Sequence, residues 1–368
     1  MIGERAGIGT LRKQPSIRKL GWGCLLGILL GGCSLPLAAQ DRPAEIRIGV
    51  AATGTGGRPV AGGSYGAIAS ESRALEKEFA RDGIKVTYTY FQGAGPTVNE
   101  WLANRQLDFA FQGDLPALAA RAGGLPTKLI LAADRFGAIY IAVPADSPAR
   151  RFGDLKGKRI GLFNGTNLQM AFYNLMLSKG LKESDFRITN MSTFEGNAAL
   201  LAGDLDAQVS YNDLVPLVET GKVRFICSTH GDKNLGRLSH LLVRNEFADK
   251  WPDLVQRVVN TFLKAAAWEA EPKNRAKVYQ IWAKSGFGVS AWKYEYDDYL
   301  LGERSSPLFD PFYRAQYKRQ LATARQLKLV RRDFDVDAWL DSRFLDQGLK
   351  TLGLQKVWRP LDEEGRPQ

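Results

Sequence analysis

Short strand-forming runs alternate with helical stretches over most of the chain after residue 44. The runs at 45–51, 84–91 and 107–114 are rich in β-branched and aromatic side chains, and amphipathic stretches follow them. Alternation of this kind predicts mostly parallel sheets covered by helices. We therefore expect an α/β fold. Beyond about residue 247 the pattern is almost wholly helical, which predicts a helical C-terminal extension.

A second set of strands and helices begins after residues 146–158. Its predicted strands are followed by two further strand-like runs that lead back toward the first set. A chain of this length is typical of two domains rather than one. The predicted strands of the second set and the returning runs are 159–165, 186–192, 206–212, 222–229 and 237–245.

The first 40 residues have the pattern of a secretory signal peptide. Five basic residues precede an apolar run at 20–32, which is too short to span a bilayer as a helix. Two processing routes remain open. Leu30–Cys33 resembles a lipobox, which predicts a signal at 1–32 and lipidation of Cys33. The other route is cleavage near residue 39. Either route predicts a periplasmic protein or a membrane-anchored lipoprotein facing the periplasm.

The cysteines and the charge narrow the function classes. Of the three cysteines, Cys24 and Cys33 fall in or beside the signal, so Cys227 alone remains and no intrachain disulfide is expected. The net charge is +11, of which the signal carries +4, leaving +7. No run of five or more basic residues is present, so the sequence gives little support to nucleic-acid binding. The excess indicates either an anionic ligand or a solvated basic surface.

A glycine-rich loop at 52–66, ATGTGGRPVAGGSYG, follows the first strand and precedes a helix predicted for 67–81. Dinucleotide binding requires G-x-G-x-x-G, but Pro59 stands where the third glycine belongs. The loop also lacks the lysine of a phosphate-binding P-loop. A nucleotide-binding enzyme is therefore the least favoured class. Glycines still allow a ligand to approach backbone amides at the start of a helix.

Three further polar turns come directly after predicted strands. Ligands of open α/β sheets bind outside the carboxyl ends of the strands, so four turns divided between two lobes predict a site between the lobes. Taken singly, each turn is also explained as an ordinary helix cap. The candidate ligand-binding residues of the four turns are Thr55, Arg58, Gln112, Gly113, Asp114, Gly165, Thr166, Asn167, Tyr211 and Asn212.

Catalytic groups are few. His230 and His240 have no metal-ligand partners at useful spacing, and Cys227 lies inside an apolar predicted strand. No catalytic residue, metal site, cofactor or enzymatic activity is therefore expected. An aromatic cluster at 282–299 allows two interpretations: helices packed on a lobe, or a hydrophobic wall over the ligand.

Several motifs resemble the substrate-binding proteins of ABC importers for nitrate, sulfonate and taurine. They are VPADSP at 143–148, DLKGKRIGL at 154–162, GDLPAL at 113–118 and LAGDLDA at 201–207. The resemblance implies a two-lobe periplasmic-binding-protein fold of type II. It also implies a lobe one of 44–136 plus 232–368 with the C-terminal helices, a lobe two of 137–231, and a monomer that docks on an ABC permease in the inner membrane.

The same resemblance implies the site residues. Gln112, Gly113 and Asp114 match the family's turn in lobe one, and 165–167 match the helix start in lobe two, but Asn212 is neutral where other members carry an acid. Arg58 and Arg135 are the candidate partners of an anion. The expected ligand is a small anionic organic solute, similar to an aliphatic sulfonate. The alternatives are a binder of a thiamine-precursor-type heterocycle and a solute-sensing lipoprotein without a transport role.

Overall fold

The computed structural model describes residues 42–368. The predicted signal peptide and the predicted lipidation site at Cys33 lie outside the described residues. None of the helices between residues 42 and 368 is both long enough and apolar enough to cross a membrane.

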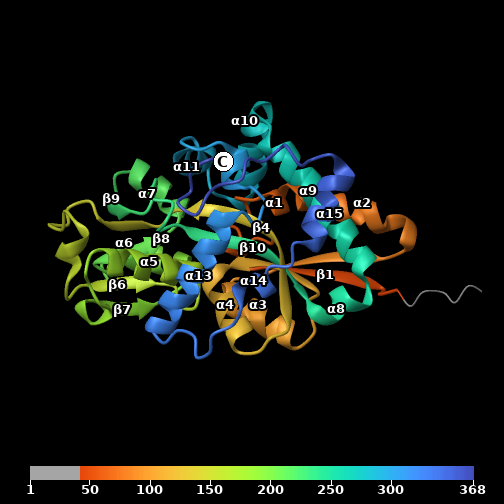
Figure 1. The fold of residues 1–368 in the computed structure, drawn as a ribbon. Coiled ribbons are helices and arrows are strands. Elements are labelled where there is room, and N and C mark those ends of the chain that lie inside the picture. Colours follow the sequence, from red (N-terminus) through yellow and green to blue (C-terminus); the bar gives the residue numbers. More distant parts are fainter. Residues whose placement is uncertain (1–41) are drawn as a thin grey trace, which may run out of the picture. The chain divides into compact units, whose positions relative to one another are not determined.

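The first sheet contains five strands in the order β2-β1-β3-β10-β4. Figure 1 labels β1, β4 and β10 of this sheet. β1 pairs in parallel with β2 and β3, so the carboxyl ends of these strands lie at one edge of the sheet. β10 returns from much later in the chain and pairs antiparallel with β3 and β4. The strands are β1 Glu45–Val50, β2 Lys85–Tyr90, β3 Phe109–Gly113, β4 Thr127–Gly137 and β10 Arg237–Arg244.

The second sheet also contains five strands, in the order β7-β6-β8-β5-β9. β6 pairs in parallel with β7 and β8, whereas β5 is antiparallel to both β8 and β9. This sheet therefore repeats the arrangement of the first. Its strands are β5 Tyr140–Pro144, β6 Arg159–Leu162, β7 Arg187–Asn190, β8 Ala207–Ser210 and β9 Val223–Ser228.

The chain passes between the two sheets twice. β4 ends in the first sheet at Gly137 and β5 begins in the second at Tyr140, so two residues separate the strands. The return lies between Ser228 and Arg237. The two sheets and the helical C-terminal region confirm the expected two-lobe α/β fold. We propose that the lobe limits fall at these two crossings, close to residues 137 and 231.

Helices follow most of the strands, and a long helical region follows β10. The helix predicted for 67–81 is interrupted, because Arg73 adopts a left-handed backbone conformation with φ +53° and separates α1 from α2. The helices are α1 Tyr65–Glu71, α2 Ala74–Phe79, α3 Ala94–Ala103, α4 Asp114–Ala122, α5 Asn167–Ser178, α6 Thr193–Ala202, α7 Val215–Glu219, α8 Asn245–Lys250, α9 Pro252–Ala270, α10 Arg275–Trp282, α11 Val289–Tyr296, α12 Leu301–Arg304, α13 Pro311–Gln326, α14 Val336–Trp339 and α15 Arg343–Leu352.

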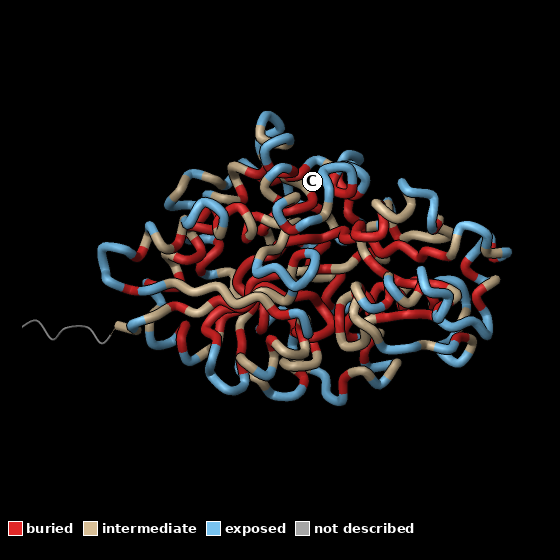
Figure 2. Tube along the Cα trace, turned by 180° about the vertical axis from the view of Figure 1, so that it is seen from behind, coloured by how far each residue is buried: buried red, intermediate tan, exposed pale blue. Residues whose placement is uncertain are grey.

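Each sheet has its own apolar core, and buried residues run along the strands of both (Figure 2). The 19-residue helix α9 covers the first sheet with a stripe of buried residues three and four positions apart, including Leu254, Val258 and Phe262. α13 contacts both α4, which follows β3, and α5, which follows β6. The C-terminal helices therefore complete the first core and also reach the second set of elements.

The buried carboxyl group of Glu269 predicts a pH-dependent stability. Glu269 lies on α9, is fully buried, and has no hydrogen-bond partner on either carboxylate oxygen within the described chain. Burial raises the pKa of Glu269 from 4.5 to about 8. The native state therefore holds a proton that the unfolded state has lost above pH 4.5, so the free energy of unfolding falls as the pH rises from 4.5 to about 8. Over this pH range, the free energy of unfolding is expected to fall by roughly 4 to 5 kcal/mol.

Urea unfolding of Glu269→Gln between pH 4.5 and pH 8 checks this prediction. The variant keeps a neutral, similarly shaped side chain, so we expect its unfolding free energy to depend less steeply on pH than that of the wild type. Glu100→Gln on α3 is the matched control, because Glu100 is exposed on its helix. A pH dependence that is unchanged in Glu269→Gln would show that this carboxyl group ionises normally in the native state.

Candidate functional site

A cavity of about 230 Å³ lies where the four polar turns meet. The turns follow β1, β3, β6 and β8, two strands from each sheet, at the carboxyl ends of parallel strands. This is the edge at which open α/β sheets bind ligands. The residues of the four turns that line the cavity are Ala51, Ala52, Thr53, Ala61, Gly62, Gly63, Ser64, Gln112, Gly113, Phe163, Thr166, Asn167, Tyr211 and Asn212.

The turn after β3 contributes Gln112 and Gly113 to the cavity. The Gln112 side chain donates through Nε2 to Asn99 Oδ1 at 3.2 Å, while its buried Oε1 has no partner within residues 42–368. Gly113 touches Asn167 from the other lobe, since a Cβ at this position would lie 2.6 Å from the Asn167 Nδ2 atom. Glycine is therefore required at 113 for the two lobes to approach this closely.

The turn after β6 is built as a helix cap. The Thr166 hydroxyl accepts a hydrogen bond from Leu168 N at 3.3 Å and donates to Phe163 O at 2.6 Å, so it fixes the start of α5. The Gly165 amide donates to Gln169 Oε1 at 2.7 Å, and Gly165 does not line the cavity. Asn167 lies at the first position of α5 and presents its side chain to the cavity.

The turn after β8 connects lobe two to the C-terminal region. Asn212 Nδ2 donates to the carbonyl of Ala291 on α11 at 3.0 Å, so this amide holds the two parts of the chain together. Tyr211 donates its hydroxyl to Asn167 Oδ1 at 3.4 Å. Of the two, Tyr211 presents an aromatic face to the cavity, and Asn212 closes one side of it.

Asp114 has a structural role in the turn after β3. It is fully buried, does not line the cavity, and accepts hydrogen bonds from Leu115 N at 2.6 Å and Leu238 N at 2.7 Å. Burial raises the pKa of Asp114 to about 7, against these two hydrogen bonds, which lower it. The expectation that Asp114 contacts the ligand is therefore corrected: its carboxyl group ties β10 to the start of α4.

Arg135 is likewise directed away from the cavity. Its guanidinium is fully buried and donates to Asp310 Oδ2 at 2.5 Å, to Leu308 O at 2.7 Å and to Ser306 O at 3.3 Å. These partners all lie in the segment before α13. The expectation that Arg135 binds an anionic ligand is corrected, because its hydrogen-bond donors are occupied by the protein itself.

Residues 54–60 of the glycine-rich loop are also outside the cavity lining. Thr55 and Arg58 are exposed, and a Cβ at Gly286 would meet the Thr55 side chain at 2.7 Å and Arg58 Nη1 at 3.5 Å. The loop therefore rests on the C-terminal region near Gly286 in this half. Its second half, residues 61–64, lines the cavity.

Arg237 is the arginine that faces the cavity, and the sequence interpretation missed it. It is the first residue of β10, the strand that returns from lobe two. Its Nε donates to Ala138 O at 3.0 Å, and its guanidinium lies 4.4 Å from the centre of the Tyr211 ring. Its Nη1 and Nη2 atoms have no acceptor within the described chain. The signal that could have identified Arg237 is its position directly after Gly236, close to the predicted crossing between the lobes.

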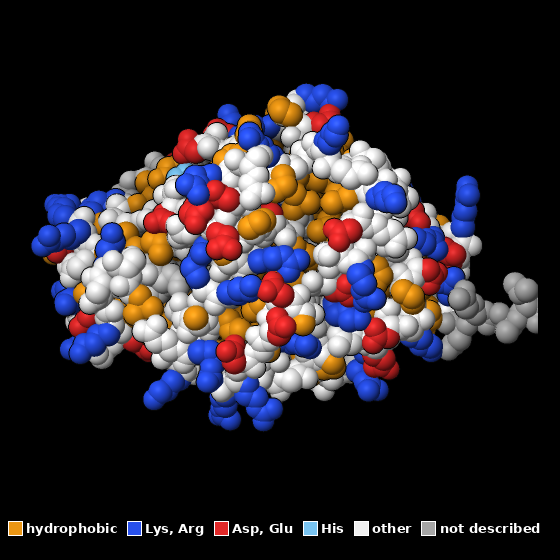
Figure 3. Space-filling view, in the orientation of Figure 1, with side chains coloured by type: hydrophobic (Ala, Val, Ile, Leu, Met, Phe, Trp, Pro, Cys, Tyr) orange, Lys and Arg blue, Asp and Glu red, His pale blue; other side chains and the backbone are white. Residues whose placement is uncertain are grey.

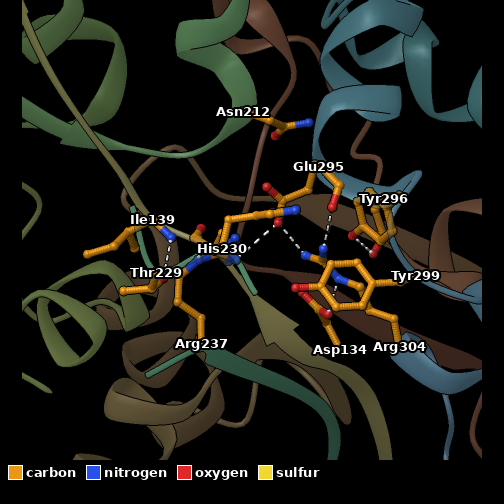
Figure 4. A network of polar contacts seen from close by, with 12 residues as sticks. Asp134, Ile139, Asn212, Thr229, His230, Arg237, Glu295, Tyr296, Tyr299 and Arg304 are labelled. Atoms are coloured by element: carbon orange, nitrogen blue, oxygen red, sulfur yellow. Dashed lines mark hydrogen bonds and ion pairs between the residues drawn. The ribbon is translucent and has the colours of Figure 1, made fainter. Parts of the chain in front are cut away.

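Two acidic side chains, Asp134 and Glu295, also line the cavity, and both pair with Arg304. Arg304 is fully buried and donates from Nε to Asp134 Oδ1 at 3.0 Å and from Nη2 to Glu295 Oε1 (Figure 4). Burial raises the pKa of Glu295, but the charges of Arg304 and Arg237 outweigh burial and hold that pKa below its usual value. Both acids are therefore ion-paired within the protein, and they share one guanidinium.

Aromatic side chains form much of the remaining lining. Of the aromatic cluster at 282–299, Phe287, Trp292 and Tyr296 line the cavity, whereas Trp282 is packed in the interior and Tyr294 is exposed. Part of the cluster therefore packs in the interior, and part of it forms a wall of the cavity. The aromatic residues that line the cavity are Tyr90, Phe91, Phe111, Phe163, Phe194, Tyr211, Phe287, Trp292 and Tyr296.

Four helices begin at the cavity. Ser64, Gly113, Thr166 and Ser192 are the N-cap residues of α1, α4, α5 and α6, and all four line it. The N-terminus of a helix carries unpaired amides and a partial positive charge. Together with Arg237, these ends give the cavity a chemistry suited to an anion.

The groups expected in a hydrolytic or metal site do not meet in the cavity. His230 bonds to Tyr140 and Asp298, and His240 is buried against Tyr317. Neither histidine lines the cavity. Within residues 42–368 no three His, Cys, Asp or Glu side chains are grouped so that they could hold a metal ion.

A comparison with protein families matches residues 74–275, more than half of the chain, to the family described as NMT1/THI5 like. The chain belongs to this NMT1/THI5-like family. A relative from Bacillus subtilis, named as an aliphatic sulfonates-binding protein, is 32% identical over 252 residues, which cover 67% of this chain and 73% of the relative.

Solved structures of similar proteins agree with this assignment. A periplasmic sulfonate-binding protein of an ABC transporter from Methylobacillus flagellatus superposes with a TM-score of 0.75 at 31% identity, covering 87% of this chain and 98% of that one. The alkanesulfonate-binding protein of Xanthomonas axonopodis pv. citri, bound to MOPS, gives a TM-score of 0.65 at 26% identity, covering 81% and 98%. A desulfurization enzyme shares the fold alone, at 19% identity. The relatives described here at 26% identity or more are all named as sulfonate-binding or alkanesulfonate-binding proteins.

Proposed function

We propose that this chain is the solute-binding protein of an ABC importer and binds an organic sulfonate. The observation that carries the proposal is Arg237, whose Nη atoms have no acceptor within the described chain while its side chain lines the cavity. A guanidinium presents paired donors that match the oxygens of a sulfonate. The names of the relatives from Bacillus subtilis and Methylobacillus flagellatus support the same ligand class.

The cavity has the properties of a binding site rather than of a reaction centre. One cationic side chain, four helix starts and several aromatic rings recognise a charge and an apolar body, whereas neither a histidine nor a cysteine of residues 42–368 lines it. We therefore propose that the protein binds and releases its ligand unchanged.

Transport through an ABC permease requires a change of shape that the permease recognises. The cavity takes residues from both sheets, so a bound ligand contacts both lobes and favours their closed arrangement. The hinge of this motion is proposed at the two crossings, near Gly137 and between Ser228 and Arg237. We propose that the protein acts in the periplasm, either free or held by a lipid on Cys33, and docks as a monomer on its permease.

The surface charge is compatible with that role. Figure 3 shows lysine and arginine side chains scattered over one face with acidic side chains between them, so this face carries no extended field of one sign. The basic excess is therefore a dispersed surface charge on this side of the molecule. The charge that matters for the ligand is that of Arg237 inside the cavity.

Thermal unfolding with and without candidate solutes tests the proposed function. We expect a saturating alkanesulfonate to raise the Tm by roughly 5 °C, because a ligand at 100 times its Kd stabilises the native state by about 2.7 kcal/mol. Sodium chloride at the same ionic strength is the control. Stabilisation by nitrate or by a neutral heterocycle, with no effect of any sulfonate, would contradict the proposal.

A further inference from the structure

The cavity is more aromatic than a site for a short alkyl chain requires. Rings from both lobes and from the C-terminal region line it, and several of them are half-buried. Aromatic rings favour the faces and edges of other rings over saturated chains, beyond the area that they bury. The half-buried rings that line the cavity include Tyr90, Phe163, Phe194, Tyr211 and Phe287.

Part of the polar lining of the cavity comes from β10, beside the second lobe crossing. Arg237 and Ser239 are two residues apart on β10 and thus face the same side, and Ser239 pairs with Gly113 and with Asp134. The aromatic wall lies against the glycine-rich loop: a Cβ at Gly62 would meet the Trp292 ring at 2.5 Å. The cavity thus combines a charged strand region with an aromatic wall.

The wall itself carries an unused donor. Trp292 Nε1 is buried and has no acceptor within the described residues, and Trp292 is only 5% exposed. An unpaired buried N–H destabilises the protein. This donor is neutral, and its ring packs against Trp282, Phe287 and Tyr296.

The two acids that line the cavity, Asp134 and Glu295, share the single guanidinium of Arg304, and Asn212 is neutral. The ammonium group of a zwitterion such as taurine would lose its hydration and would have to compete with Arg304 for these acids. This competition favours a ligand that carries no positive charge.

The volume favours a ligand larger than a two-carbon sulfonate. The cavity holds about 230 Å³, several times the space that a single water molecule needs. A sulfonate group with two carbons leaves part of this apolar space to water. A one-ring or two-ring body fills it and buries its faces against the rings.

We propose that the preferred ligand is an aromatic sulfonate, with its sulfonate on Arg237 and its ring system against Phe194, Phe287 and Trp292. This inference rests on the proposed function and names the substrate class of the same site. It predicts discrimination against taurine and against short alkanesulfonates.

Isothermal titration calorimetry with the mature chain tests the inference. The probes are naphthalene-2-sulfonate, benzenesulfonate, cyclohexanesulfonate, ethanesulfonate and taurine. We expect naphthalene-2-sulfonate to bind at least tenfold more tightly than ethanesulfonate and taurine, and benzenesulfonate to bind more tightly than cyclohexanesulfonate, which has the same ring size without π-faces. Ethanesulfonate or taurine binding as tightly as the aryl sulfonates would overturn the inference and leave the proposed function standing. Binding of none of the five would overturn both.

Variants of the aromatic lining give a second, independent measurement. Phe194→Leu and Phe287→Leu replace half-buried rings at the cavity and are expected to weaken naphthalene-2-sulfonate binding about fivefold each, with ethanesulfonate changed less than twofold. Phe225→Leu is the matched control, since Phe225 is a half-buried ring outside the lining. Equal losses for both ligands would show that these rings support the fold and do not select the ligand.

Discussion

Replacing Arg237 with glutamine is expected to weaken sulfonate binding at least 100-fold while the protein still folds. The guanidinium lines the cavity, and its Nη atoms have no acceptor within the described chain, so both are available to a ligand oxygen. Hydrogen bonds to charged groups contribute about 1.5 to 3 kcal/mol each, and a 100-fold change in Kd corresponds to roughly 2.7 kcal/mol. Glutamine keeps a polar side chain of moderate length but removes the charge. Calorimetric titration of the variant with an alkanesulfonate or aryl sulfonate measures the loss.

Two further variants make this result specific. Arg58→Gln is the matched control, because Arg58 is exposed and does not line the cavity, so binding is expected to stay at the wild-type level. Arg237→Lys keeps the charge without the paired donors and is expected to recover part of the affinity. Loss of binding in Arg58→Gln with normal binding in Arg237→Gln would place the anion site in the glycine-rich loop instead.

The α/β fold was accessible from the sequence because its signals are local. Strand-forming runs, polar turns and helix caps are each encoded within a few residues, and their alternation limits the possible architectures. The four turns were identified in this way, and the structure brings them around one cavity. The prediction of one continuous helix over 67–81 was wrong, because nothing in the local sequence pattern indicates the left-handed conformation of Arg73.

The choice between arginines could not be made from the sequence. Arg135 and Arg237 both lie at the lobe crossings, and the face that each presents depends on strand geometry. Successive side chains of a strand point to opposite faces, and Asp134 takes the cavity side of β4, so Arg135 points toward Asp310, which lies 175 residues further along the chain. The expectation, which was based on charge alone, therefore selected Arg135, whose guanidinium is buried and bonded to Asp310.

The sequence also could not show that the C-terminal helices contribute residues to the cavity. Glu295 and Trp292 lie on α11, which follows the second crossing by more than 50 residues, yet both line the cavity. Helical periodicity predicts that such residues are buried but does not state what they face. Long-range packing decides which rings of the aromatic cluster are core and which line the cavity. In this protein some of the rings do one and some do the other.

The second large effect is expected on stability, from Arg304→Met. Arg304 is fully buried and bonds both Asp134 and Glu295, so its loss leaves two buried carboxylates without their cation. Breaking a buried ion pair by removal of one partner costs about 3 to 5 kcal/mol. We expect urea unfolding of Arg304→Met to show a loss of that size. Arg366→Met is the control, because Arg366 is exposed, and no measurable loss of unfolding free energy is expected from this variant.

Neutralising the partners distinguishes an ionic origin from a packing defect. If charge is the cause, the triple variant Arg304→Met, Asp134→Asn and Glu295→Gln regains most of the stability, because no unpaired charge remains buried. Glu295 also accepts hydrogen bonds from Ala138 N at 3.0 Å and from the Tyr140 hydroxyl at 2.5 Å, on either side of the first crossing. A triple variant as unstable as Arg304→Met would contradict the ionic account. It would show that Arg304 stabilises the fold chiefly by packing against the rings of Tyr296 and Tyr299.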